Sequence, residues 1–336
     1  MVGKKLLSCL LGGLVLGTSI LTGCSSATSS STSNSNKVLN IGISQLVEHP
    51  ALDSARKGFV DALASKGFKD GEKVKIDFQN AQGDIPTAQT IASNFVSNKK
   101  DLILAIATPA AQAAYNSTKE IPILMTAVTD PVKSGLVKSM NKPDTNVTGT
   151  SDALPLDKQF ELIKKIVPNC KKIGILYNTS EANSELQVKA AKEEAAKMNL
   201  EVIATGVTSS NDMPQGLNDL LSKVDVLYTP TDNLVASSMS LISSKCLEKK
   251  IPVIGAEKAH VDSGALATEG IDYYKLGFQT GLMAADILDG KKPQDMPVQT
   301  LKETKLIINE DTAKKLNIAI PDDLKAKAEI VKGGAK

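Results

Sequence analysis

The sequence is poor in several residue types on which common functional sites depend. Its 336 residues include no tryptophan, two histidines and four cysteines, and aromatic residues make up 3% of the chain. Of its 39 basic residues, only Arg56 is an arginine. A single guanidinium argues against an arginine clamp on a ligand carboxylate, so helix N-termini and hydroxyl groups would have to bind such a group.

The few histidines and cysteines exclude most metal and nucleophilic sites. Neither His49 nor His260 has the spacing of a metal-binding pair or a Gly-x-Ser-x-Gly motif as a partner. Cys170 and Cys246 lack metal-ligand spacing and are either a disulfide or two buried thiols. We expect no metal site, while an acid–base pair among the many carboxylates stays open because no spacing singles one out.

The glycine-rich loops that bind phosphate groups are also absent. No Gly-x-Gly-x-x-Gly follows the first predicted strand, and Gly-x-x-x-x-Gly-Lys-Ser/Thr does not occur. We therefore expect no nucleotide cofactor, and no other cofactor. The formal net charge is +2, with both signs mixed along the chain, which argues against a nucleic-acid-binding protein.

The first 36 residues differ from the rest of the chain. Two lysines precede an apolar stretch at 6–16, which is too short for a membrane span of about 20 residues, and Leu-Thr-Gly-Cys follows at 21–24. This pattern resembles a bacterial lipoprotein cleavage site. It predicts a signal peptide over 1–23, a lipid on Cys24 that anchors the protein to the cell membrane, and a Ser/Thr-rich tether over 24–36. An ordinary secretory signal with a chance cysteine is the alternative.

From residue 38 onward, short apolar runs alternate with amphipathic helical patterns. Strands are predicted at 39–43, 74–78, 102–107, 123–128, 172–177, 202–205, 225–228, 253–255, 265–268 and 305–308. Helices are predicted at 52–66, 85–97, 182–198, 234–249 and 275–288. This alternation predicts an α/β protein whose parallel sheets are covered by helices on both faces.

A weak internal repeat indicates two similarly wound halves. Ile-Gly-Ile at 41–43 recurs at 173–175, and Ile-Pro-Ile at 121–123 recurs as Ile-Pro-Val at 251–253. The chain is also too long for one compact core. We predict two doubly wound lobes joined by three crossings, with one large sheet as the alternative. Lobe 1 is expected to contain 37–150 and 270–297, and lobe 2 to contain 151–269 and 298–336.

Several predicted strands end in polar clusters that precede a helix. In open parallel sheets, ligands bind beyond the carboxyl ends of strands, so these clusters are expected to meet in a cleft between the lobes. Thr108 is a predicted N-cap whose helix offers free N–H groups, Ala110 included, to a carboxylate. Each residue singly could be only a turn or cap. The candidate ligand-binding residues are Gln45, Glu48, Thr108, Ala110, Thr129, Asp130, Ser151, Asp152, Asn178, Glu181, Asn183, Ser184, Asp232, Asn233 and Asp272.

Several of these strings together resemble one family. They lie at 41–50, 79–84, 107–112, 126–131, 146–152, 177–184 and 230–233, within a resemblance that extends over about 39–320. They resemble the substrate-binding lipoproteins of ABC importers, in the tryptophan/tyrosine-type group with the type I periplasmic-binding-protein fold. The resemblance implies two Rossmann-like lobes that close by a hinge motion on an aromatic amino acid. It also implies a non-enzymatic, monomeric, extracytoplasmic protein that delivers the ligand to a permease and its ATPase.

An amino-acid ligand has two charged groups that this cleft would have to bind. Thr108, Thr129 or Ser151 would contact the carboxylate, and Asp130, Asp152, Glu181 or Asp232 would contact the ammonium group. Tyr177 and Tyr228 are either ring contacts or core residues. Replacing Asp232 by alanine is then expected to weaken binding and leave folding largely intact. The alternatives are a nucleoside or sugar receptor, a sensor with a membrane signalling partner, and an extracellular hydrolase.

Overall fold

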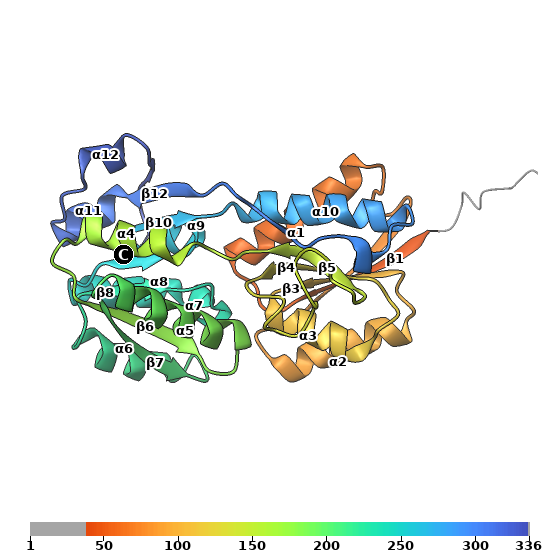
Figure 1. Cartoon of the computed structure of the whole chain (residues 1–336), viewed down its shortest axis with the longest axis horizontal. Coiled ribbons are helices and arrows are strands. Elements are labelled where there is room, and N and C mark those ends of the chain that lie inside the picture. The colour runs from red at the N-terminus through yellow and green to blue at the C-terminus, as the bar shows by residue number, and fades with distance from the viewer. Residues whose placement is uncertain (1–37, 335–336) are drawn as a thin grey trace, which may run out of the picture. The chain divides into compact units, whose positions relative to one another are not determined.

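The computed structural model describes residues 38–334 (Figure 1). The predicted signal peptide, the lipidation site at Cys24 and the Ser/Thr-rich tether lie outside the described residues. Each of the two sheets in the described part forms the centre of one lobe, as predicted. No helix within residues 38–334 has the length and apolar character needed to cross a bilayer.

Lobe 1 has a six-stranded parallel sheet in the order β11-β5-β4-β3-β1-β2. The strands are β1 (Leu39–Gln45), β2 (Val74–Asn80), β3 (Leu102–Ile106), β4 (Ile123–Val128), β5 (Val147–Ser151) and β11 (Gln299–Thr300). All five residues of β3 are buried, as expected for an apolar central strand. One face is covered by α2 (Ile85–Ser97) and α3 (Thr108–Ser117), and the other by α1 (Pro50–Ser65) and α10 (Tyr273–Leu288) (Figure 1).

Glycines set the close packing of α1 against α10. A Cβ added to Gly277 would lie 1.8 Å from the carbonyl oxygen of Ala55, and one added to Gly58 would lie 2.1 Å from that of Tyr274. Only glycine allows the two backbones to approach this closely. The late helix α10 is therefore an integral part of lobe 1.

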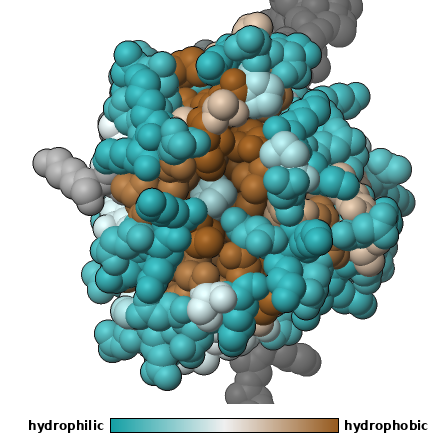
Figure 2. Space-filling model, turned by 90° about the vertical axis from the view of Figure 1, so that its left-hand side faces the viewer, coloured by the Kyte–Doolittle hydropathy of each residue, from teal (hydrophilic) through white to brown (hydrophobic). Residues whose placement is uncertain are grey.

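Lobe 2 has a seven-stranded sheet in the order β13-β12-β10-β9-β8-β6-β7, in which only the β10–β12 pair is antiparallel. Its strands are β6 (Lys172–Asn178), β7 (Glu201–Val207), β8 (Val226–Thr229), β9 (Val253–Gly255), β10 (Ala267–Gly270), β12 (Lys305–Asn309) and β13 (Glu329–Val331). Its helices are α4 (Leu156–Ile166), α5 (Ala182–Lys197), α6 (Met213–Leu221), α7 (Asn233–Ser237), α8 (Met239–Glu248), α9 (Lys258–Asp262), α11 (Glu310–Leu316) and α12 (Asp322–Lys325). Figure 2 shows an apolar strip between hydrophilic side chains at the end of this lobe that faces away from lobe 1.

The chain passes between the lobes three times, after β5, after β10 and after β11. The predicted end of lobe 1 at residue 297 is wrong, because Gln299 and Thr300 pair with β5. The two other boundaries shift by one residue, since Ser151 still belongs to β5 and Gly270 to β10. The strand β11 has two exposed residues and therefore no apolar pattern that could have placed it.

Two further local predictions differ from the structure, and the structure decides between the two alternatives left open for Cys170 and Cys246. The helix predicted at 234–249 is two helices, α7 and α8, that meet at Ser238. The N-cap of α3 is Ala107 rather than Thr108, because Ala107 has a φ of 82° and the helix begins at the next residue. Cys170 and Cys246 are buried free thiols in separate core clusters, which excludes a disulfide between them.

Candidate ligand-binding site

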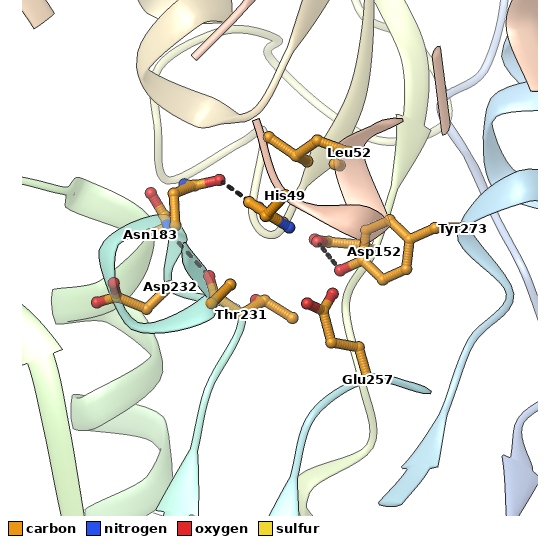
Figure 3. Close-up of a pocket in the computed structure, with 11 residues that line it drawn as sticks. His49, Leu52, Asp152, Asn183, Thr231, Asp232, Glu257 and Tyr273 are labelled. Carbon is orange, nitrogen blue, oxygen red and sulfur yellow. Dashed lines mark hydrogen bonds between the residues drawn. The ribbon is translucent and has the colours of Figure 1, made fainter. Parts of the chain in front are cut away.

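A small cavity lies between the two lobes, at the carboxyl ends of their strands (Figure 3). It is lined by His49, Leu52, Ala127, Asp152, Asn183, Thr231, Asp232, Asn233, Ala236, Glu257 and Tyr273. These residues come from lobe 1, lobe 2 and the first crossing, so the cavity is formed by both lobes together.

Two side-chain contacts join the lobes beside this cavity. The Nε2 atom of His49 lies 3.5 Å from Oδ1 of Asn233, although 184 residues separate them. The hydroxyl groups of Thr129 and Thr231 are 3.2 Å apart. Burial lowers the pKa of His49, with the charge of Glu257 acting in the opposite direction. The lobes therefore meet through polar contacts.

Asp152, Glu257 and Tyr273 form one group in the cavity wall, which we call the hinge acid group. The Tyr273 hydroxyl donates a hydrogen bond of 2.8 Å to Oδ2 of Asp152, and the Glu257 carboxylate points toward the same hydroxyl (Figure 3). Both carboxylates are 2% exposed. The second oxygen of each, Oδ1 of Asp152 and Oε1 of Glu257, is buried and has no hydrogen-bond partner among the described residues.

Burial and neighbouring groups act differently on these two acids. Burial raises the pKa of Asp152 to about 6, although hydrogen bonds from Tyr273 and Thr129 oppose the shift. Burial also acts to raise the pKa of Glu257, but His260, His49 and the Tyr273 hydroxyl hold it below its usual value. The Nε2 atom of His260 lies 3.2 Å from Glu257 Oε1, within ion-pair distance but not aligned for a hydrogen bond.

Glu181 and Asp232 form a second pair of buried carboxylates, which we call the cap acid pair. Asp232 is the N-cap of α7 and accepts backbone N–H groups from Val235 at 2.9 Å and Asn178 at 2.6 Å. Glu181 accepts side-chain amides of Asn178, Asn183 and Asn233. Burial and the charge of Asp232 raise the pKa of Glu181 to about 7, and burial raises that of Asp232. This pair holds loops of lobe 2 together.

The backbone is strained where β3 and β4 end. Ala107 has a φ of 82° and Ala127 a φ of 56°, in the left-handed region that residues other than glycine rarely adopt. At Ala127 the pairing of β4 with β5 shifts register between Met125 and Val128. This irregularity places Ala127 in the cavity wall and Thr129 beside Thr231.

The structure divides the predicted site residues into three groups. Asp152, Asn183, Asp232 and Asn233 line the cavity. Thr129, Asn178, Glu181 and Ser184 form hydrogen bonds with lining residues, and Ser151 donates one to the Thr129 carbonyl. Gln45, Glu48, Thr108, Ala110, Asp130 and Asp272 do not line it. Among the last group, Gln45 binds Asp53, Asp130 binds Lys133 and Asp272 caps α10.

Sequence reasoning missed His49, Glu257 and Tyr273 as cavity residues. His49 belongs to a string that carried the family resemblance, and Glu257 follows strand β9, so the strand-end rule could have found both. Tyr273 is the first residue of a helix and gave no such signal. Residues 38–334 contain no cluster of three or more His, Cys, Asp or Glu side chains placed to hold a metal ion.

Residues 40–332 match the model of the family described as ABC transporter substrate binding protein. The chain belongs to this family. It is 57% identical over 321 residues to a tyrosine-binding protein of Clostridioides difficile (strain R20291), and the match covers 94% of this chain and 93% of that protein. ABC transporter substrate-binding proteins act outside the cytoplasm with an ABC permease.

Two solved structures show which arrangement the lobes adopt. The domain of an ABC protein from Streptococcus pneumonia in complex with L-Trp has a TM-score of 0.85 at 42% identity, covering 88% of this chain and all of that one. The ligand-free, open structure of a substrate-binding protein from Clostridium difficile has a TM-score of 0.68 at 56% identity, covering 89% and 100%. Since the sequence identities rank the two structures in the opposite order, the TM-scores indicate that the lobes lie more as in the L-Trp complex than as in the open, ligand-free structure.

More distant structures show the fold alone. The leucine-binding protein LivK of Thermotoga maritima has a TM-score of 0.52 at 14% identity, covering 72% of this chain and 67% of its own. The predicted type I periplasmic-binding-protein fold is therefore confirmed. The predicted family and the solute-binding role are confirmed as well.

Proposed function

We propose that this substrate-binding protein binds an aromatic amino acid in the cavity between its lobes and delivers it to the permease and ATPase of an ABC importer. The observation that carries the proposal is the closed cavity, whose wall holds hydrogen-bond acceptors without partners in Asp152, Asn183 and Glu257. The names of two similar proteins, one tyrosine-binding and one in complex with L-Trp, support an aromatic ligand. Leu52, Ala127 and Ala236 supply apolar surface for a ring.

Thermal melting with a panel of solutes tests the ligand class. L-tyrosine, L-tryptophan and L-phenylalanine are compared with other amino acids, a nucleoside and a sugar on the purified mature protein. At 100 times its Kd a ligand adds about 2.7 kcal/mol to stability, which corresponds to a Tm increase of about 5 °C or more. If a nucleoside or sugar raises Tm and no amino acid does, the ligand assignment is wrong.

The absence of tryptophan from the chain allows a direct binding measurement. With excitation at the red edge of tyrosine absorption, the fluorescence of added L-tryptophan has no protein background. Enclosure in the cavity should shift its emission to shorter wavelength. Mass spectrometry of the released ligand should return it unchanged, because the proposed role involves no catalysis; a converted product would support the hydrolase alternative.

The proposed location rests on Cys24. Lipid attachment there would hold the protein on the outer face of the membrane by a flexible tether, as a monomer. Replacing Cys24 by alanine should release the protein from the membrane fraction. The matched control is Cys9→Ala, which lies in the segment predicted to be removed and should leave the mature protein membrane-bound.

A further inference from the structure

We infer that the hinge acid group of Asp152, Glu257 and Tyr273 binds the ammonium group of the ligand, and that this ammonium group is required for the lobes to close. The inference rests on the proposed function and specifies which chemical group of the ligand each part of the cavity recognises. It concerns two residues, Glu257 and Tyr273, that strand-end reasoning did not select.

Two buried carboxylate oxygens without hydrogen bonds support the assignment of the ammonium site. The Tyr273 hydroxyl satisfies Oδ2 of Asp152, but Oδ1 of Asp152 and Oε1 of Glu257 are left as buried acceptors without a hydrogen bond. A buried acceptor without a donor is costly and rare in folded proteins. An ammonium group carries three N–H donors and can serve both oxygens at once.

The charges around the cavity favour a cationic hydrogen-bond donor over a neutral one. No lysine or arginine lines the cavity, and the nearest groups able to carry positive charge are His49 and His260. His260 makes a hydrogen bond of 3.0 Å to Thr229 through Nδ1, and its Nε2 lies 3.2 Å from Glu257 Oε1 without forming a hydrogen bond. Two carboxylates beside so little positive charge favour a cationic ligand, because a charge-assisted hydrogen bond is about twice as strong as a neutral one.

The cap acid pair does not compete for this role. The oxygens of Glu181 and Asp232 already accept backbone and side-chain N–H groups within lobe 2. An ammonium group placed there would have to displace these bonds. Among the carboxylates of the cavity wall, the acceptors without hydrogen bonds in residues 38–334 therefore belong to the hinge acid group, and Asn183 Oδ1, which also has none, is a neutral amide oxygen.

The origin of the three residues links this site to closure. Asp152 follows β5 on the first crossing, Glu257 follows β9 in lobe 2, and Tyr273 opens α10 in lobe 1. An ammonium group bound between them joins both lobes at the hinge. A ligand without that group leaves two carboxylates facing each other in a closed cavity, which opposes closure.

A series of three ligands tests the ammonium requirement by calorimetry and small-angle X-ray scattering. L-tyrosine is compared with tyramine, which lacks the carboxylate, and with 3-(4-hydroxyphenyl)propionate, which lacks the ammonium group. We expect the propionate to bind at least about 100-fold more weakly than L-tyrosine and to leave the radius of gyration unchanged, and tyramine to retain measurable binding. Binding of the propionate within threefold of L-tyrosine would overturn the inference.

Variants of the protein identify the residues. Asp152→Asn and Glu257→Gln keep the side-chain shape and should each weaken L-tyrosine binding about 30-fold or more, while Tyr273→Phe should weaken it about tenfold. The matched control is Asp219→Asn on exposed α6, which should bind normally. Circular dichroism verifies folding of each variant. If Asp152→Asn and Glu257→Gln both fold and bind L-tyrosine within threefold of wild type, the inference fails.

The outcomes separate this inference from the proposed function. If the wild-type protein binds a non-aromatic amine, and Asp152→Asn binds that amine about 30-fold more weakly, the proposal of an aromatic ligand is wrong and the ammonium site is supported. A protein that bound only solutes without an amine would overturn both.

Discussion

The hinge acid group and the cap acid pair lie on two sides of one cavity, and the carboxylates of both are buried. In the cap acid pair, the oxygens of Glu181 and Asp232 accept hydrogen bonds from the chain itself. In the hinge acid group, Asp152 and Glu257 each keep one oxygen without a hydrogen-bond partner among the described residues. Burial and charge alone do not distinguish these pairs, whereas their hydrogen bonds do: one pair stabilises loops and the other offers acceptors to a ligand.

The largest expected effect is that of Asp232→Ala on stability. The substitution leaves the N–H groups of Val235 and Asn178 without their acceptor, and we expect a loss of about 2 to 4 kcal/mol in the free energy of unfolding by urea. The matched control is Asp272→Ala, an exposed N-cap of α10 whose loss should cost about 1 kcal/mol. This replaces the sequence-based expectation that Asp232→Ala affects binding alone. A variant of unchanged stability and poor affinity would restore it.

The second prediction concerns the pH dependence of the state described here, in which Asp152 is buried. The pKa of Asp152 is about 6 in the folded state and about 3.8 in the unfolded chain. Protonation of Asp152 therefore stabilises the folded state, fully below pH 3.8, and this stabilisation is lost as pH rises through 6. Acidification from pH 7 to 4 should therefore gain up to about 3 kcal/mol from this residue. Tm of wild type and Asp152→Asn against pH measures the difference, and parallel curves would contradict the prediction.

A smaller effect is expected for Glu181→Gln, which tests whether the cap acid pair affects binding. Glutamine keeps the shape of the side chain and removes a charge that burial and Asp232 already disfavour. We expect stability at pH 7 to change by no more than about 1 kcal/mol and ligand affinity by less than threefold. A loss of affinity equal to that of Glu257→Gln would show that both pairs contact the ligand.

The smallest expected effect is that of Thr129→Val. It removes the hydroxyl contact to Thr231 across the lobes and keeps a β-branched side chain of similar size. One such hydrogen bond contributes about 1 kcal/mol, so affinity should fall about two- to fivefold while the ligand-free protein keeps its Tm. Calorimetry measures the affinity; a fall in Tm without a change in affinity would mean that the contact stabilises the lobes individually.

The fold could be predicted where burial leaves a pattern in the chain. Strand β3 is apolar throughout because helices cover both faces of its sheet. Strand β5, with the sequence VTGTS, was missed because hydroxyl groups interrupt its apolar pattern, and its burial depends on Thr150 meeting Thr126 and Thr280. Such a threonine cluster is visible only after the sheet has formed.

The candidate site was predictable only in part, for a similar reason. The strand-end rule selected Asp152, Asn183 and Asp232, which line the cavity in the structure. It could not tell that Asp232 is satisfied within α7 while Asp152 is not, because the partner of Asp152 is Tyr273, 121 residues away. Whether a carboxylate serves the fold or a ligand depends on contacts made in three dimensions.

The two-part composition of lobe 1 has a consequence for the order in which the chain can fold. Its helix α10 and strand β11 are made only after most of lobe 2, and α10 packs closely on α1 at Gly58, Gly277 and Gly281. A growing chain that ends near residue 270 has β5 as an open sheet edge and lacks the helix α10 that packs on α1. Lobe 1 therefore reaches its native packing only when about 300 residues have been synthesised, and the stretch before that point is a target for chaperones rather than a finished domain.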